Sequence, residues 1–146
     1  MKKTVSLCAL AALLITTGCT SMPQNHSNSV TTTDLQHRNF ALLQFNGQTL
    51  PTDNKYKNPN LEFAEGMHIS GAVCNRFNGQ AQLNNNVLSA PNLAATRMMC
   101  EPTLNQIESA LFKTLSDGAT ISFDGKTLTL KNSQNTFVYT IADYVR

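Results

Sequence analysis

The sequence predicts an α+β domain, built mainly from an antiparallel β-sheet that is curled and barrel-like, with one principal helix at about residues 103–117. Over most of 35–146, apolar and polar residues alternate in short runs, which is the period of half-buried strands. The segment 104–115 instead repeats its apolar residues at three and four positions, which is the period of a helix. A sheet that curls around or packs on one helix is the simplest way to cover all these faces.

The strands are predicted from alternating runs that end at residues typical of tight turns. These turns are Asn46-Gly47, Glu65-Gly66, Asn78-Gly79, Asn84-Asn85-Asn86 and Asp124-Gly125. In chain order, the predicted strands are 40–45, 61–64, 67–73, 80–83, 87–90, 119–123, 127–130 and 136–141.

The helix is predicted from one apolar face and from the residues at its two ends. The face consists of Leu104, Ile107, Leu111 and Leu115. Thr103 would cap the first turn, and Gln106 three residues later would complete a capping box. Pro102 would precede the helix and Gly118 would end it.

The first 18 residues predict an export signal. Two lysines precede an apolar run at 5–15, and small residues then lead to Cys19. The run has about eleven residues, whereas a helix that crosses a membrane needs about 20. Gly18-Cys19 resembles the bacterial lipobox, in which the cysteine is acylated and becomes the new first residue. We therefore predict a signal peptide at 1–18 and lipid attachment at Cys19.

A tether and a location follow from this signal. Residues 19–34 are predicted to be the lipidated N-terminus and a flexible tether, because they are rich in Ser, Thr and Asn. Thr20 rather than Asp follows the lipobox cysteine, which resembles the rule for transfer to the outer membrane in enteric-type bacteria. We expect a protein anchored by lipid in the bacterial outer membrane and facing the periplasm. The folded domain would span 35–146.

The sequence contains four cysteines, of which Cys74 and Cys100 remain after the signal and the lipid site are set aside. In an oxidising compartment such a pair is more often a disulfide than two free thiols. This disulfide would stabilise the domain by roughly 3.5 kcal/mol. A redox-active pair is normally spaced as Cys-x-x-Cys, so the wide spacing here disfavours that role.

The charge balance argues against a nucleic-acid partner. The 11 basic residues exceed the 9 acidic ones only because of Lys2 and Lys3 in the signal, so the mature chain is formally neutral. We predict no metal and no cofactor, because two cysteines and His68 fall short of a four-ligand site. A copper(I) site that also uses Met98 and Met99 stays open as an alternative.

No catalytic residues are predicted. The chain contains no G-x-S-x-G elbow, no H-E-x-x-H motif and no Gly-rich phosphate loop. Five acidic residues are interpreted as parts of solvated faces or turn ends: Glu62, Glu65, Glu101, Glu108 and Asp117. We therefore expect a protein that is not an enzyme, although a catalytic pair that meets only in space stays open.

The segment 69–79, ISGAVCNRFNG, followed by ATRMMC at 95–100, resembles the META domain, specifically the HslJ-like heat-inducible bacterial lipoproteins. That family has a Gly, a Cys-Asn pair and an aromatic-x-Gly turn, followed later by a Thr and a Cys. The resemblance covers 35–144, with Phe40 where many members have Trp. It implies a compact, mainly antiparallel β domain that is exported, lipid-anchored and linked to stress, and it implies no reaction.

Asn75, Arg76 and Arg97 are the possible binding residues. One interpretation is structural: Asn75 satisfies backbone groups, Phe77 fills the core and Gly79 provides a tight bend. In the other, Arg76 and Arg97 are held close together by the disulfide and form a patch that binds a carboxylate or phosphate.

The predicted function is that of a non-enzymatic, lipid-anchored envelope protein, which acts in heat or envelope stress by binding a protein or cell-wall partner. A tether raises the effective concentration of the domain near the membrane and so supports weak binding. The alternative is a periplasmic inhibitor of a cell-wall hydrolase, or a holdase-type chaperone. Either would need an exposed loop or apolar patch.

Overall fold

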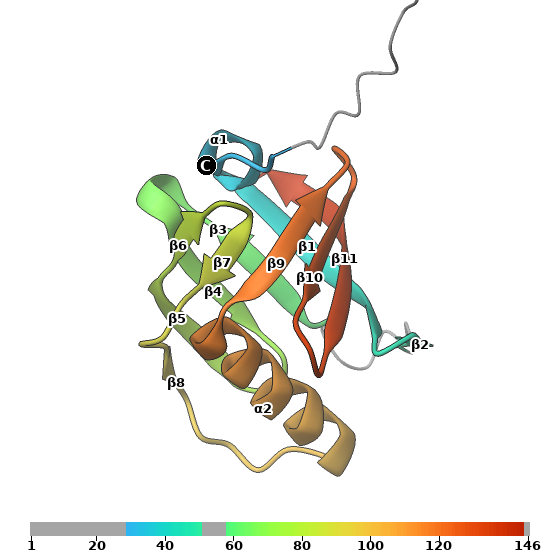
Figure 1. The fold of residues 1–146 in the computed structure, drawn as a ribbon. Coiled ribbons are helices and arrows are strands. Elements are labelled where there is room, and N and C mark those ends of the chain that lie inside the picture. Colours follow the sequence, from blue (N-terminus) through green and yellow to red (C-terminus); the bar gives the residue numbers. More distant parts are fainter. Residues whose placement is uncertain (1–28, 51–57, 145–146) are drawn as a thin grey trace, which may run out of the picture.

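The structure is a computed structural model that describes residues 29–50 and 58–144, and the backbone alone at residue 144 (Figure 1). The predicted signal peptide, the lipid site at Cys19 and most of the predicted tether lie outside the described residues.

The described strands form one antiparallel sheet of eleven strands, which confirms the predicted fold class. The strand order is β6-β7-β9-β10-β11-β1-β3-β4-β5-β8, with β2 paired to β1. In chain order the strands are β1 (Arg38–Phe45), β2 (Gln48–Thr49), β3 (Asn60–Phe63), β4 (His68–Ala72), β5 (Arg76–Gln80), β6 (Gln82–Asn84), β7 (Val87–Ser89), β8 (Ala94–Ala95), β9 (Ala119–Phe123), β10 (Thr127–Lys131) and β11 (Thr136–Tyr144).

The sheet must curl because two consecutive strands lie near its opposite ends. Only Ala81 separates β5 from β6, and one residue spans at most about 3.5 Å. Ala81 is buried, and its N–H donates to the carbonyl of Met67 at 3.0 Å. The continuous strand predicted at 80–83 is therefore wrong, because the chain bends at Ala81 from one end of the sheet to the other. Figure 1 shows the resulting half-barrel.

The core lies on the inner face of this half-barrel. Phe40 is fully buried and meets the rings of Phe63 and Phe123 edge-to-face, with centroids 6.0 and 5.6 Å away. The pairing of β1 with β11 shifts register just before Gln44, which places Phe45 in the core at the position where strict alternation would place Gln44.

The predicted helix is present as α2 (Pro102–Asp117), and Figure 1 shows it along the lower end of the half-barrel. The capping box predicted on Thr103 and Gln106 is wrong. The helix begins one residue earlier, with Pro102 at its first position, and the preceding Glu101 makes no side-chain cap hydrogen bond. Proline suits that position because its φ is already helical and its missing N–H would have no intrahelical partner.

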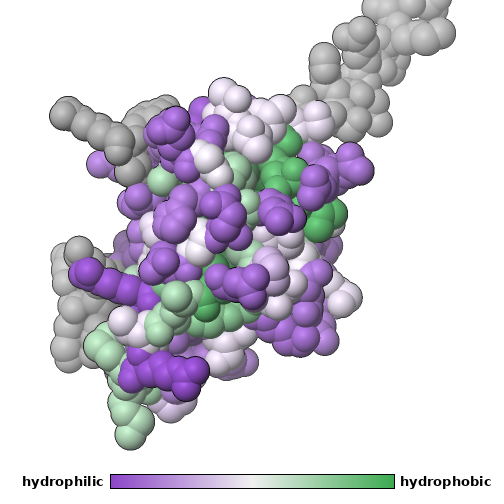
Figure 2. Space-filling view, turned by 90° about the vertical axis from the view of Figure 1, so that its left-hand side faces the viewer, coloured by the Kyte–Doolittle hydropathy of each residue, from purple (hydrophilic) through white to green (hydrophobic). Residues whose placement is uncertain are grey.

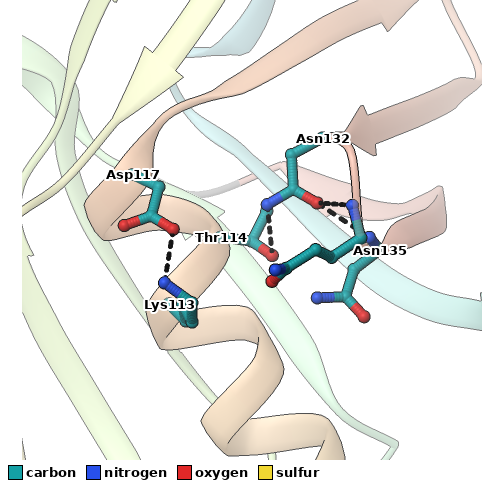
Figure 3. A network of polar contacts seen from close by, with 6 residues as sticks. Lys113, Thr114, Asp117, Asn132 and Asn135 are labelled. Atoms are coloured by element: carbon teal, nitrogen blue, oxygen red, sulfur yellow. Dashed lines mark hydrogen bonds and ion pairs between the residues drawn. The ribbon is translucent and has the colours of Figure 1, made fainter.

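A polar contact fixes the C-terminal half of α2 to the turn between β10 and β11 (Figure 3). The amide of Asn132 donates to the hydroxyl of the buried Thr114 at 3.3 Å, and its oxygen accepts the N–H of Asn135 at 2.7 Å. On the exposed side of the helix, Lys113 and Asp117 form an ion pair at 2.7 Å. Such an exposed pair contributes little to stability, so the Asn132 contact is the more important of the two.

A short helix, α1 (Thr32–Leu35), occupies the end of the predicted tether. A capping box starts it, in which Thr31 and Asp34 each bond the backbone of the other. Val30 is buried, and its N–H donates to the side chain of Asn86 at 2.9 Å. The folded part therefore includes Val30 and α1, which overlap the predicted tether at 19–34.

Two tight hairpins are formed by the predicted turn residues. Asn46 and Gly47 have φ of 49° and 80°, and Asn85 and Asn86 have φ of 48° and 61°. Positive φ at both central residues is the requirement of a type I′ turn. Gly118, with φ of 93°, follows the last residue of α2 as predicted.

The predicted turn at Asn78-Gly79 is wrong, because both residues lie inside β5. Gly79 is required for a different reason: a Cβ there would lie 2.8 Å from the backbone oxygen of Asn92. The turn predicted at Glu65-Gly66 is confirmed as part of the 3-10 helix η1 (Glu65–Met67), in which Gly66 has φ of 66°.

The turn between β9 and β10 should make stability depend on pH at its acidic end. The carboxylate of Asp124 accepts the N–H groups of Lys126 and Thr127 at 2.8 and 2.6 Å. The bond from Thr127 is the main cause that lowers the pKa of Asp124 below its ordinary value of 3.8. A depressed folded-state pKa means that this stabilisation is complete above 3.8 and is lost as the pH falls through the lower value.

We therefore expect Asp124→Asn to unfold at a lower temperature than the natural chain at pH 7. The two melting temperatures should converge well below pH 3.8, and thermal unfolding followed by circular dichroism measures both. An equal difference at both pH values would show that the charge of Asp124 contributes nothing.

Candidate functional site

The family-like motifs meet at the lower end of the sheet in Figure 1, where β4, β5, β8 and the start of α2 come together. Cys74, in the β4–β5 connection, forms a disulfide with Cys100, which lies just before α2. The Cα atoms are 6.0 Å apart. The predicted disulfide is therefore present, and it joins two connections that the sheet alone would not hold together.

Asn75 is the centre of a buried hydrogen-bond network beside this disulfide. It is 4% exposed, and its side-chain amide donates to Glu108 Oε1 at 2.8 Å. Its side-chain oxygen accepts the hydroxyl of Thr96 at 3.0 Å and the N–H of Met98 at 2.6 Å. These contacts agree with the structural interpretation of Asn75, because its side-chain oxygen accepts the backbone N–H of Met98.

Glu108 is the residue of this site that the sequence interpretation missed. It was expected on a solvated face, and that is wrong: it is 8% exposed on the inner side of α2. Its Oε2 accepts the backbone N–H of Cys74 at 3.2 Å and of Asn75 at 2.7 Å. The only local sign that Glu108 would be buried is that it directly follows the buried Ile107 on the helix. The groups it bonds come from a connection more than 30 residues away.

Arg76 and Arg97 are exposed on neighbouring segments, which Thr96 links. The N–H of Arg76 donates to the hydroxyl of Thr96 at 3.2 Å, and the N–H of Thr96 donates to the carbonyl of Arg76 at 3.0 Å. The predicted proximity of the two backbones is thus present. The two residues nevertheless line different hollows, so an anion patch shared by them stays a prediction.

Two shallow hollows flank this region. One, of about 640 Å³, lies on the outer face of the sheet, where Arg76 is joined by Asn39, Asn60, Glu62, Ser70 and Asn78. The other, of about 400 Å³, lies between β8 and α2, where Arg97 is joined by Leu93, Met98, Asn105, Glu108 and Phe112. The Asn75–Glu108 network forms part of the wall of the second hollow.

The most exposed apolar side chains belong to the segment 96–99, which we call the Met loop. Met98 is 60% exposed and Met99 is fully exposed, and Arg97 beside them is also exposed. Among the described residues, the other large apolar side chains on the surface are Leu43 and Val87, which are less exposed. Figure 2 shows a mostly hydrophilic face with hydrophobic residues protruding at its lower end.

The copper(I) alternative loses its thiolate ligands, because the two cysteines are bonded to each other. His68 begins β4, at the far end of that strand from Cys74. Over 29–50 and 58–144, no three His, Cys, Asp or Glu residues gather as metal ligands would. Over the same ranges, no helix is long and apolar enough to cross a membrane.

The META domain family matches residues 33–144, which include every residue of the site described above. The chain belongs to the META domain family. It is 40% identical over 145 residues to the heat shock protein HslJ of Escherichia coli (strain K12), with 98% of each chain covered. The resemblance to the HslJ-like branch is thereby confirmed.

Two solved structures share the fold. An NMR structure of a protein 40% identical to this chain superposes with a TM-score of 0.72, covering 78% of this chain and 97% of the other. An NMR structure of a protein from Burkholderia xenovorans is 22% identical and gives a TM-score of 0.62. The match covers 76% of this chain and 86% of the other. The second shows the fold alone. Membership of the META domain family does not by itself assign a reaction.

Proposed function

We propose that this META domain protein is a lipid-anchored protein of the bacterial envelope that acts in the heat or envelope stress response by binding a partner, without catalysis. The stress role is supported by the name of the HslJ relative, which is a heat shock protein. The lipid anchor and the periplasm-facing position at the outer membrane are supported by the export signal and the lipobox-like Gly18-Cys19.

The observation that carries the binding role is an exposed apolar loop whose backbone is held in place. Asn75 accepts hydrogen bonds from both Thr96 and Met98, and the disulfide fixes Cys100 just beyond the loop. A loop that is already ordered loses less conformational entropy when it binds. Methionine side chains adapt to irregular surfaces and are common at binding sites that accept varied partners.

The partner-binding face is therefore assigned to the Met loop, with Arg97 as its charged residue. The Asn75–Glu108 network supports the loop from behind and is not itself offered to the partner. Arg97 forms no ion pair with the described residues, so its guanidinium is available for a carboxylate or phosphate on the partner.

Photo-crosslinking in living cells tests this role. A photoreactive residue placed at position 99 should capture a specific protein or cell-wall fragment after heat or a cell-wall drug. The same residue at the exposed Ser133, in the β10–β11 connection, should not. Identical products from both positions, or none from position 99, would contradict the proposal.

Binding measurements with purified proteins then give the contribution of the Met loop to affinity. The double variant Met98→Ser, Met99→Ser should bind the captured partner at least about tenfold more weakly, which is a loss of about 1.4 kcal/mol. Val87→Ser is the matched control, because Val87 is also an exposed apolar residue but lies on β7. Equal weakening by both changes would argue against the Met loop.

The anchor has its own test. Cys19→Ser should abolish the incorporation of labelled fatty acid and move the protein from the membrane fraction to the soluble fraction. Unchanged incorporation of the labelled fatty acid would show that Cys19 is not the lipid site. The binding role of the Met loop is tested separately by the crosslinking experiment.

Inhibition of a cell-wall hydrolase is the second candidate function. A protruding loop with an ordered backbone suits insertion into an enzyme cleft, whereas a holdase would need a wider apolar surface than the few exposed side chains described here. Purified protein should then slow lysozyme or cell-wall lysis, and the Met98→Ser, Met99→Ser variant should not. Equal lysis rates with and without the protein would remove this candidate.

A further inference from the structure

The reactive sulfur atoms of the described chain are distributed unevenly between surface and core. Met98 is 60% exposed and Met99 is fully exposed, whereas Met67 is 6% exposed and belongs to the core. Cys74 and Cys100 are joined in the disulfide, so neither offers the thiolate that normally reacts first with oxidants. The thioethers of the Met loop are therefore the sulfur groups that the described surface presents to an oxidant.

We propose that Met98 and Met99 form a reversible oxidation site, modified by a peroxide. A thioether sulfur donates an electron pair to one oxygen of hydrogen peroxide, the O–O bond breaks, and the products are a sulfoxide and water. The sulfur loses two electrons and the peroxide gains them. A methionine sulfoxide reductase that uses a dithiol reverses the change, and yields the thioether, a disulfide and water.

The structure separates this modification from folding. Met98 is held through its backbone N–H, which donates to Asn75 at 2.6 Å, and Met99 projects fully into solvent. Neither residue belongs to the buried core. A sulfoxide on either side chain can therefore be solvated where it stands, and the hydrogen bonds that position the loop are unchanged.

The modification would change the chemical character of the partner-binding face. Sulfoxidation turns an apolar, adaptable side chain into a polar one, which weakens contact with an apolar partner. Its regulatory role rests on the proposed function, since it switches off the same loop that binds the partner. The oxidation site itself rests only on the exposure of the two residues.

The test treats the purified full chain with dilute hydrogen peroxide and follows Met67, Met98 and Met99 by peptide mass mapping. Met98 and Met99 should each gain one oxygen at least about tenfold faster than Met67, and a methionine sulfoxide reductase should reverse this. The melting temperature should stay unchanged when only the loop is oxidised. Oxidation of all three at one rate, or unfolding on oxidation of the loop, would overturn the proposal.

Two matched variants complete the design. In Met98→Leu, Met99→Leu the loop keeps its apolar character but cannot be oxidised, and Met67→Leu makes the same change in the core. The crosslinking probe is a photoreactive residue at the exposed Asn105, which lines the same hollow as Met98. Each protein is compared with itself before oxidation: crosslinking should fall on oxidation in the natural chain and in Met67→Leu, and should not change on oxidation in the double Leu variant. Absence of a partner before oxidation would defeat the proposed function, while the mass mapping would still decide the oxidation site.

Discussion

Glu108→Ala should lower the free energy of unfolding by about 4 kcal/mol, because it leaves three donors in a buried site without their acceptor. These donors are the backbone N–H groups of Cys74 and Asn75 and the side-chain amide of Asn75. Urea unfolding of the disulfide-bonded protein, followed by fluorescence or circular dichroism, measures the loss.

Glu65→Ala is the matched control for this prediction, because Glu65 is an exposed glutamate in η1. It should change the free energy of unfolding by less than about 0.5 kcal/mol. The loss in free energy of unfolding for Glu108→Gln should lie between those for Glu65→Ala and Glu108→Ala, because the amide keeps one acceptor oxygen. A loss below about 1 kcal/mol for Glu108→Ala would show that water replaces the carboxylate at little cost.

Glu108→Ala also tests whether the buried network supports the proposed binding face. Asn75 is bonded to Glu108 on one side and to Thr96 and Met98 on the other. When Glu108 is lost, Asn75 is held less firmly and the Met loop should become more mobile. Hydrogen exchange at the N–H of Met98 should therefore be faster in Glu108→Ala than in Glu65→Ala.

Phe40→Ala is expected to cost about 4 kcal/mol, which is within the range for removing a large aromatic side chain from a core. Phe40 is fully buried and contacts the rings of Phe63 and Phe123. These two rings belong to β3 and β9, which lie on opposite sides of β1 in the strand order. Its removal opens a cavity that these strands cannot close without moving apart. Urea unfolding again measures the change.

Two substitutions serve as controls for Phe40. Phe40→Leu keeps most of the apolar volume and should cost clearly less than Phe40→Ala. Leu43→Ala, on the same strand but partly exposed, should cost less than about 1 kcal/mol. If Phe40→Ala cost no more than Leu43→Ala, the core would not be centred where the structure places it.

Short-range information in the sequence predicted most of the elements correctly. The strand predicted at 119–123 is present with those bounds as β9, and the helix was placed to within one residue. Such elements depend on residue periodicity and on turn residues that need positive φ, and both act between residues close in sequence. The disulfide was predicted for a different reason: once the signal and the lipid site are set aside, only two cysteines are left to pair.

Three of the errors share one cause, which is a partner that lies far away in the sequence. Gly79 was interpreted as a turn residue because its nearby contact with Asn92 was invisible in the sequence. Glu108 was assigned to the solvent because the N–H groups that it bonds come from the β4–β5 connection. Val30 was assigned to the tether because its hydrogen-bond partner is Asn86.

The sequence by itself determined the main helix and most of the longer strands of this META domain protein, their approximate ends, and the pairing of its two remaining cysteines. The tertiary structure alone decided that Asn75 and Glu108 would be buried together, and that Arg76 and Arg97 would line different hollows. It also decided that Met98 and Met99 would face the solvent. The physical reason is that local backbone preferences are set by neighbouring residues, whereas burial and hydrogen bonding of a side chain depend on which distant segments the curled sheet brings beside it.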